Sequence, residues 1–161
     1  MASPRRSPPL LDARGARFLI VEARYYEYIA AMLLEGAKTA FAKAGASFDI
    51  VGVPGALEIP LALVIALDHA AASNRPFDGA VALGCVIRGE THHFDIVANE
   101  SARALMQLAL ARKLAFGNGV LTVDNEAQAL ARADPQQGDK GGDAARAALS
   151  IHRLKLAVGA P

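Results

Sequence analysis

Strand-like apolar runs alternate with helical patterns along this chain, and that alternation limits the folds open to it. Short, continuous apolar runs are typical of strands that are buried on both faces, as in parallel sheets. Apolar residues at helical spacing lie between the runs and would form the crossover helices. The sequence therefore predicts an α/β domain with a parallel sheet between layers of helices.

The expected strands are Arg17–Ala23, Ser47–Val53, residues 77–84 and residues 120–123. The expected helices are residues 28–44, ending at Gly45, then Ile59–Ala72, residues 94–116, Glu126–Ala133 and, after a polar break at 134–142, a last helix to about Leu156. Residues 1–16 are rich in Pro, Ser and Arg. We expect them to form a flexible N-terminal arm, or a segment lying along another subunit, and residues 17–161 to form a single domain.

Composition excludes several classes of function. The chain has 161 residues, 53% of them hydrophobic, which is enough for one domain with a substantial core. No apolar run approaches the roughly 18 residues of a membrane span, and residues 1–9 lack the apolar core of a signal peptide. A net charge of +1 gives no general attraction to nucleic acid or anionic membranes. Cys85 is the single cysteine, so we expect no internal disulfide and a cytoplasmic location.

Three polar turns follow expected strands. They are residues 23–27, residues 54–60 and the start of the stretch from Gly84 to Glu100. The carboxyl ends of parallel strands share one edge of a sheet, which is where ligands bind in open α/β folds. We therefore expect one ligand to contact all three turns.

Residues in the first two turns have an ordinary interpretation beside the functional one. Tyr25 and Tyr26 would either pack on the sheet edge or form an aromatic plate for a flat heterocycle. Glu58 would either complement the dipole of the following helix or accept hydrogen bonds from sugar-like hydroxyls. Gly55 fits plain turn chemistry.

The third turn carries residues suited to proton transfer and anion binding. His92 and His93 would be either a solvated pair or a source of one acid–base imidazole. A metal site is a weak interpretation because no third ligand stands at a recognised spacing. Thr91 would either cap the next helix or, with the free N–H groups there, bind an anion.

Two further residues complete the set, and familiar catalytic motifs do not match the chain. Arg132 would be either a helix C-terminal cation or a phosphate clamp. Cys85 suits a small buried hydrophobe better than a nucleophile. The glycines at 138–142 lack the spacing of a phosphate-binding loop, and there is no nucleophile elbow. The residues alone indicate a flavodoxin-like α/β enzyme or binder for a phosphate-bearing small molecule and a planar one.

Several separate motifs resemble the lumazine synthase family of riboflavin biosynthesis. They are GALEIP at 55–60, LGCVIRGETHHFD at 83–95, NE at 99–100, GVLTVDNE at 119–126 and DKG at 139–141, in order between about Phe18 and Leu156. The resemblance implies a flavodoxin-like three-layer sandwich with a four-stranded parallel sheet flanked by helices. It also implies a transferase that needs no metal or redox cofactor and assembles as a homopentamer with active sites between subunits.

The resemblance also implies roles for individual residues. His93 would transfer protons. Residues that would bind 5-amino-6-(D-ribitylamino)uracil are Tyr25, Ala56, Leu57, Glu58, Cys85, Val86, Ile87 and Asn118. Residues that would bind 3,4-dihydroxy-2-butanone 4-phosphate are Glu90, Thr91 and Arg132, with Lys140 near the site.

Departures from the family pattern keep other hypotheses open. Leu57 and Asn118 stand where the family often has phenylalanine, and Cys85 where it usually has threonine. A paralogue that binds flavin or lumazine without efficient catalysis, or serves mainly in assembly, is the alternative; a redox flavoprotein is a weaker one. Proline and glutamines at 134–137 favour a free pentamer over a closed shell. The expected partners are small-molecule substrates and other copies of the chain, with no nucleic acid or membrane.

Overall fold

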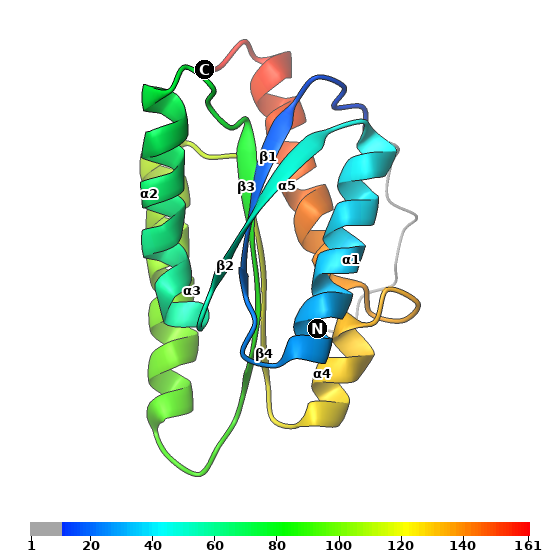
Figure 1. Cartoon of the computed structure of the whole chain (residues 1–161), viewed down its shortest axis with the longest axis vertical. Helices are drawn as coiled ribbons and strands as arrows, with labels where there is room; N and C mark the ends of the chain where they lie inside the picture. The colour runs from blue at the N-terminus through cyan, green and yellow to red at the C-terminus, as the bar shows by residue number, and fades with distance from the viewer. Residues whose placement is uncertain (1–10) are drawn as a thin grey trace.

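The computed structural model describes residues 11–161 and contains a four-stranded parallel sheet with the strand order β2-β1-β3-β4. The strands are β1 (Arg17–Ala23), β2 (Ser47–Val53), β3 (Gly79–Ile87) and β4 (Phe116–Val123). All four run downward in Figure 1, so their carboxyl ends meet at one edge. The parallel sheet predicted from the alternating pattern is confirmed.

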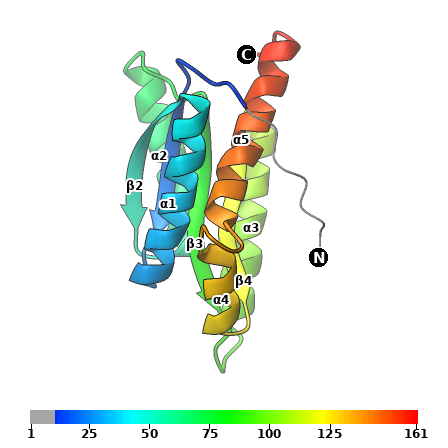
Figure 2. The same ribbon diagram turned by 90° about the vertical axis from the view of Figure 1, so that its right-hand side faces the viewer.

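Helices cover both faces of the sheet and complete three layers. One face carries α1 (Glu27–Ala44), α4 (Glu126–Ala133) and α5 (Lys140–Ala157), which stand in front of the sheet in Figure 2. The other face carries the short 3-10 helix η1 (Ala56–Glu58), α2 (Ile59–Ala72) and α3 (His93–Arg112). The α/β three-layer fold expected from the sequence is therefore confirmed. Within residues 11–161, no helix has both the length and the hydrophobicity that crossing a bilayer requires.

Strand β1 shows why both faces need covering. Its side chains alternate between two core clusters: Phe18 and Ile20 face α1 and α5, whereas Leu19 and Val21 face α2 and α3. All four are buried, and Phe18 stacks on Phe41 of α1 with ring centroids 4.7 Å apart. Burying an aliphatic or aromatic side chain contributes about 1.5–3 kcal/mol, so each layer of helices is held by this strand.

The outer face of α2 remains apolar and exposed. Its inner residues Ile59 and Leu63 are fully buried, but Leu61 and Ile65 are 65% and 62% exposed. Strand β2, at the edge of the sheet, is also open to solvent along much of its length. Exposed apolar side chains gathered on one helix face are typical of contact sites.

Most element boundaries agree with the sequence pattern. β1, β2, α2 and α4 have the expected bounds, and α1 begins one residue early, at Glu27. Gly45 ends α1 as expected, with a φ of 77° that suits glycine. The predicted arm, residues 1–16, lies largely in residues 1–10, outside the described part. Leu11, Ala13 and Ala16 are buried against the core, and Ala13 donates to the carbonyl of Ala44 at 2.8 Å, so residues 11–16 pack on the domain.

Several expected boundaries were wrong. β3 begins at Gly79 instead of 77 and continues to Ile87, because residues 85–87 pair with the end of β4. α3 ends at Arg112, where Lys113 adopts a left-handed conformation, and β4 begins at Phe116 instead of 120. α5 begins at Lys140, so the polar break is shorter than 134–142. Pairing between β3 and β4 determines where β3 ends and where β4 begins. The spacing of apolar side chains along the sequence does not reveal this pairing.

Close packing of α5 on β4 explains why glycines occupy positions 117 and 119, which resemble a loop in the sequence. A Cβ at Gly117 would lie 1.9 Å from the carbonyl oxygen of Ala144, and one at Gly119 would lie 3.0 Å from the Cβ of Ala144. Helix α5 therefore packs directly against the backbone of β4 at Gly117 and Gly119. The glycines reflect a close approach of helix to strand and not a loop.

We expect Gly117→Ala to lower the free energy of unfolding by about 1–3 kcal/mol or more, because the added methyl group forces α5 away from β4. Urea unfolding followed by circular dichroism at one protein concentration measures the change. Gly52→Ala is the matched control, because a Cβ at that strand position meets nothing within 4 Å. Equal stability of the two variants would contradict the packing argument.

Candidate active site

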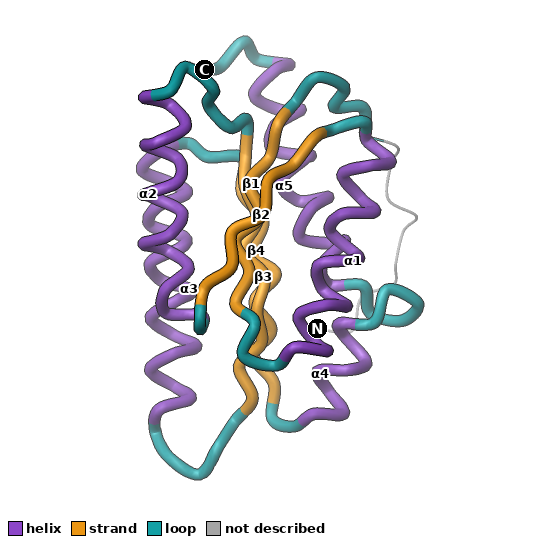
Figure 3. Tube along the Cα trace, viewed as in Figure 1, coloured by secondary structure: helices purple, strands orange, loops and turns teal. Residues whose placement is uncertain are grey.

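A cavity of about 390 Å³ opens at the carboxyl edge of the sheet, where Figure 3 shows the connecting turns below the strands. It brings together the three turns predicted from the sequence. The lining residues are Tyr25, Tyr26, Gly55, Ala56, Leu57, Glu58, Cys85, Val86, Ile87, Gly89, Thr91, His93, Phe94 and Val97. Its size is typical of a site for a small molecule.

The first turn supplies an aromatic wall. Tyr25 is 74% exposed, and its ring meets Tyr26 edge-to-face with centroids 5.0 Å apart. Tyr26 is half-buried, and burial raises the pKa of its phenol. An exposed aromatic face beside an anchored one is suited to stacking against a planar ligand.

The second turn folds into η1 directly before α2. Ala56 is buried in the core, while Leu57 and Glu58 are exposed and line the cavity. Pro60 lies at the start of α2, where its missing N–H has no partner to lose. The site thus gains one aliphatic contact and one carboxylate that can accept hydrogen bonds.

The end of β3 forms the inner wall. Cys85, Val86 and Ile87 pair with residues 121–123 of β4, so their backbone is fixed by the sheet. Burial raises the pKa of the Cys85 thiol to about 11. The thiol is therefore neutral near pH 7, and the half-buried side chain packs against the core.

Arg88 fixes the position of the third turn. Its backbone N–H donates to the carbonyl of Val123 at 2.9 Å, and its Nε donates to Asp124 at 3.0 Å. Its guanidinium also lies 3.6 Å from Asp95 and 4.3 Å from the centre of the Phe94 ring. One side chain therefore joins the ends of β3 and β4 to the first turn of α3.

The start of α3 separates the two histidines. His93 is the first residue of the helix and lines the cavity, and its N–H donates to the Thr91 hydroxyl at 3.4 Å. His92 precedes the helix, and its Nδ1 lies 3.4 Å from a carboxylate oxygen of Asp95. The structure thus brings His93 and Thr91 to the cavity, whereas His92 is absent from its lining.

Three other predicted site residues do not line the cavity of this chain. Glu90 is exposed in the third turn. Asn118 is exposed in the middle of β4 and accepts a hydrogen bond from the N–H of Val120 at 3.0 Å. Arg132 lies on α4, across the sheet from α3, and donates to the carbonyl of Gln128 at 3.1 Å.

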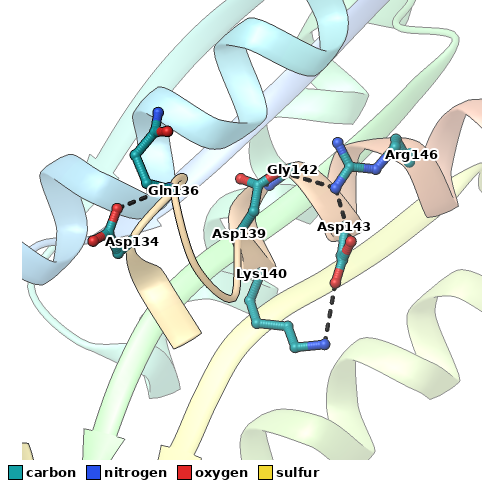
Figure 4. A network of polar contacts seen from close by, with 7 residues as sticks. All are labelled: Asp134, Gln136, Asp139, Lys140, Gly142, Asp143 and Arg146. Atoms are coloured by element: carbon teal, nitrogen blue, oxygen red, sulfur yellow. Dashed lines mark hydrogen bonds and ion pairs between the residues drawn. The ribbon is translucent and has the colours of Figure 1, made fainter. Parts of the chain in front are cut away.

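Lys140 belongs to a separate polar network, drawn in Figure 4. Its Nζ donates to Asp143 at 3.1 Å. Arg146 binds Asp139 at 3.0 Å and Asp143 at 2.8 Å, and Asp139 caps α5 by accepting from the N–H of Gly142 at 3.3 Å. The network fixes the start of α5 and places Lys140 outside the cavity lining.

Three lining residues were not predicted from the sequence. Gly89 follows Arg88, and Phe94 and Val97 lie on the first turns of α3. Val97 follows His93 by four positions and so shares its helix face, a spacing that could have identified it. Within residues 11–161, no group of three or more His, Cys, Asp or Glu side chains is placed to hold a metal ion.

Comparison with known proteins agrees with this geometry. The family model for 6,7-dimethyl-8-ribityllumazine synthase matches residues 15–155, which include every residue of the cavity. The chain belongs to the 6,7-dimethyl-8-ribityllumazine synthase family. The lumazine synthase resemblance of its motifs is thereby confirmed.

Named relatives match over almost the full length. The 6,7-dimethyl-8-ribityllumazine synthase of Methylocella silvestris is 67% identical over 99% of both chains. That of Beijerinckia indica is 62% identical, covering 99% of this chain and 89% of the relative. The 6,7-dimethyl-8-ribityllumazine synthase 1 of Rhizobium meliloti is 63% identical over 91% of this chain and 96% of the relative.

We expect Cys85 to react slowly with iodoacetamide at pH 7–8 in the folded protein, because only the thiolate attacks. The rate should rise with a midpoint near the folded pKa of about 11. Mass spectrometry of the alkylated chain gives the rate at each pH. In urea, the same cysteine should titrate near its ordinary pKa, and a folded midpoint at or below that value would contradict the burial argument.

Proposed function

We propose that this chain condenses 5-amino-6-(D-ribitylamino)uracil with 3,4-dihydroxy-2-butanone 4-phosphate to form 6,7-dimethyl-8-ribityllumazine in riboflavin biosynthesis. Phosphate and water are released. The observation that carries the proposal is the convergence of three motif-bearing turns on one cavity in a member of this family. The cavity offers an aromatic plate, hydrogen-bonding groups, a helix N-terminus and an imidazole, which match a flat ring, a polyol, a phosphate and proton transfer.

The pyrimidine substrate fits the inner part of the cavity. Tyr25 stacks on the ring, and the backbone of Cys85, Val86 and Ile87 contacts the ring edge. Ala56 and Leu57 flank the ribityl chain, and Glu58 accepts hydrogen bonds from its hydroxyls. The exposed Tyr25 ring and the sheet-fixed backbone at 85–87 support this placement.

The phosphate substrate fits the start of α3. The backbone N–H groups that open this 20-residue helix, together with its dipole, favour an anion there. Thr91 lies in the cavity wall, and Glu90 contributes its backbone with its carboxylate directed away. Arg132 completes the clamp from a neighbouring copy, since its own α4 lies across the sheet from α3.

The enzyme acts mainly by holding two substrates in register. The amine of the uracil attacks the ketone and forms an imine with loss of water. Phosphate is eliminated, and ring closure releases water again. Correct alignment of two reactants removes much of the barrier to such a condensation, and His93 transfers protons between the reacting groups.

Mixing the protein with both substrates and following lumazine fluorescence tests the activity. Product formation that depends on both substrates and scales with protein is the expected result. The alternative, a binder of flavin or lumazine, has support from the exchanged residues Leu57, Cys85 and Asn118. Binding of lumazine without product at any protein concentration would favour that alternative and overturn the synthase proposal.

The working form is a homo-oligomer, for which we propose a free pentamer in the cytoplasm. The exposed Leu61 and Ile65 of α2, and Met106 and Leu110 of α3, support an apolar contact between copies. The separation of Arg132 and Asn118 from the cavity supports a site completed by a neighbour. Sedimentation velocity distinguishes a pentamer from a monomer or a larger shell.

We expect His93→Ala to reduce kcat by about 100-fold while leaving measurable activity, because alignment of the substrates persists without the proton shuttle. Steady-state fluorescence assays measure the loss. His92→Ala is the matched control, since that imidazole interacts with Asp95 and does not line the cavity. A larger loss in His92→Ala than in His93→Ala would reverse the assignment.

Arg132→Ala should raise the KM for the phosphate substrate by roughly tenfold or more, because a charge-assisted hydrogen bond contributes about 1.5–3 kcal/mol. The KM for the uracil substrate should change little. Arg153→Ala, which removes an exposed arginine from α5, serves as the control. An unchanged KM for the phosphate substrate in Arg132→Ala would refute the clamp.

A further inference from the structure

Glu22 is a carboxylate in an otherwise apolar part of the central strand β1. It is 4% exposed and stands in register between Gly52 of β2 and Leu83 of β3. One of its oxygens accepts a hydrogen bond from Arg24 at 2.6 Å. The other, Oε2, is buried and has no hydrogen-bond partner among residues 11–161.

Stability gives no reason for this arrangement. A buried polar atom without a partner destabilises a fold, and a buried ion pair is often replaced by apolar side chains at no loss. Isoleucine and valine fill the neighbouring positions of β1 and are completely buried. A group that lowers stability in the core is most often retained for function.

Arg24 carries the effect of Glu22 to the edge of the sheet. Its guanidinium also binds Glu27, in the first turn of α1, at 2.8 Å. The backbone N–H of Arg24 donates to the carbonyl of Val53 at 3.3 Å. The Arg24 side chain thus joins the end of β1 to the start of α1. Tyr25 and Tyr26 are the two residues between those fixed points, and both line the cavity.

This turn is also held by Tyr26, which is half-buried and packs against the core. Tyr26 occupies the N-cap position of α1 but makes no side-chain capping bond. Tyr25 is largely exposed and contacts Tyr26 edge-on. The orientation of Tyr25 therefore depends on the backbone at 24–26, which the Arg24 bridge between Glu22 and Glu27 restrains.

We propose that Glu22 is a positioning residue, which holds Arg24 and thereby fixes the turn that presents Tyr25 to the pyrimidine substrate. The inference rests on the proposed function, in which Tyr25 stacks on that ring. Glu22 itself does not touch substrate. It stiffens the aromatic wall before the ligand arrives, so less conformational entropy is lost on binding.

Kinetics of Glu22→Leu in the intact enzyme test the proposal. We expect the KM for the ribitylaminouracil to rise roughly threefold to tenfold, with kcat and the KM for the phosphate substrate within about twofold. The midpoint of thermal unfolding should be unchanged or higher. Arg24→Met, which breaks the same bridge at a half-buried position, should reproduce the KM rise, and Glu22→Gln should show a smaller one.

A double-mutant cycle separates positioning from general damage. Tyr25→Ala should raise the same KM, and adding Glu22→Leu to it should cause no further rise. Asp49→Asn is the control, since it breaks an Arg–carboxylate pair with Arg17 at the opposite end of β1, and it should leave every constant unchanged.

Each other outcome overturns the proposal. Additive effects of Glu22→Leu and Tyr25→Ala on the KM for the uracil substrate would make Glu22 merely structural. So would a loss of stability in Glu22→Leu accompanied by a lower kcat and an equal rise in both KM values. An effect of Tyr25→Ala with none from Glu22→Leu or Arg24→Met would refute positioning and leave the proposed function intact. No effect from Tyr25→Ala would instead refute the stacking role itself.

Discussion

The fold depends on the burial of the two central strands along most of their length. β1 and β3 present apolar side chains on both faces, so each face must be covered by helices. Connections that return over a face to reach the same end of the sheet make all strands parallel. The carboxyl ends then meet at one edge, and the turns that follow them meet there too. The cavity at this edge is a direct consequence of how the core is covered.

Because buried strands and their covering helices leave apolar patterns in the sequence, much of the fold could be predicted from it. Arg17–Ala23 and Ser47–Val53 are bounded by clear breaks, and their bounds agree with the structure. The start of β4 could not be predicted, because residues 114–116 continue the apolar pattern of α3 and the glycines that follow resemble a loop. Pairing with β3 and the close approach of α5 decide that segment. Both are long-range contacts that no local pattern contains.

The candidate site, too, could be predicted from the sequence only in part. The convergence of the three turns follows from topology, so the cavity walls at Tyr25, Glu58 and His93 could be predicted before the structure. Val97 was missed although its helical spacing from His93 was available. The positions of Arg132 and Asn118 relative to the cavity depend on the sheet face and on neighbouring copies, which one chain's pattern does not encode. Their roles, like that of His93, remain predictions drawn from family resemblance.

The bare backbone of β4 beneath α5 has a consequence for how this strand can evolve. On the α5 side, Gly117 and Gly119 leave no room for a larger residue. On the opposite side, Asn118 and Thr122 are exposed, and exchanges at such surface positions usually change stability by less than about 0.5 kcal/mol. One face of the strand is therefore fixed by packing, while Asn118 and Thr122 on the other face can be exchanged at little cost in stability. Selection can alter the outward chemistry of β4 without disturbing the domain that carries it.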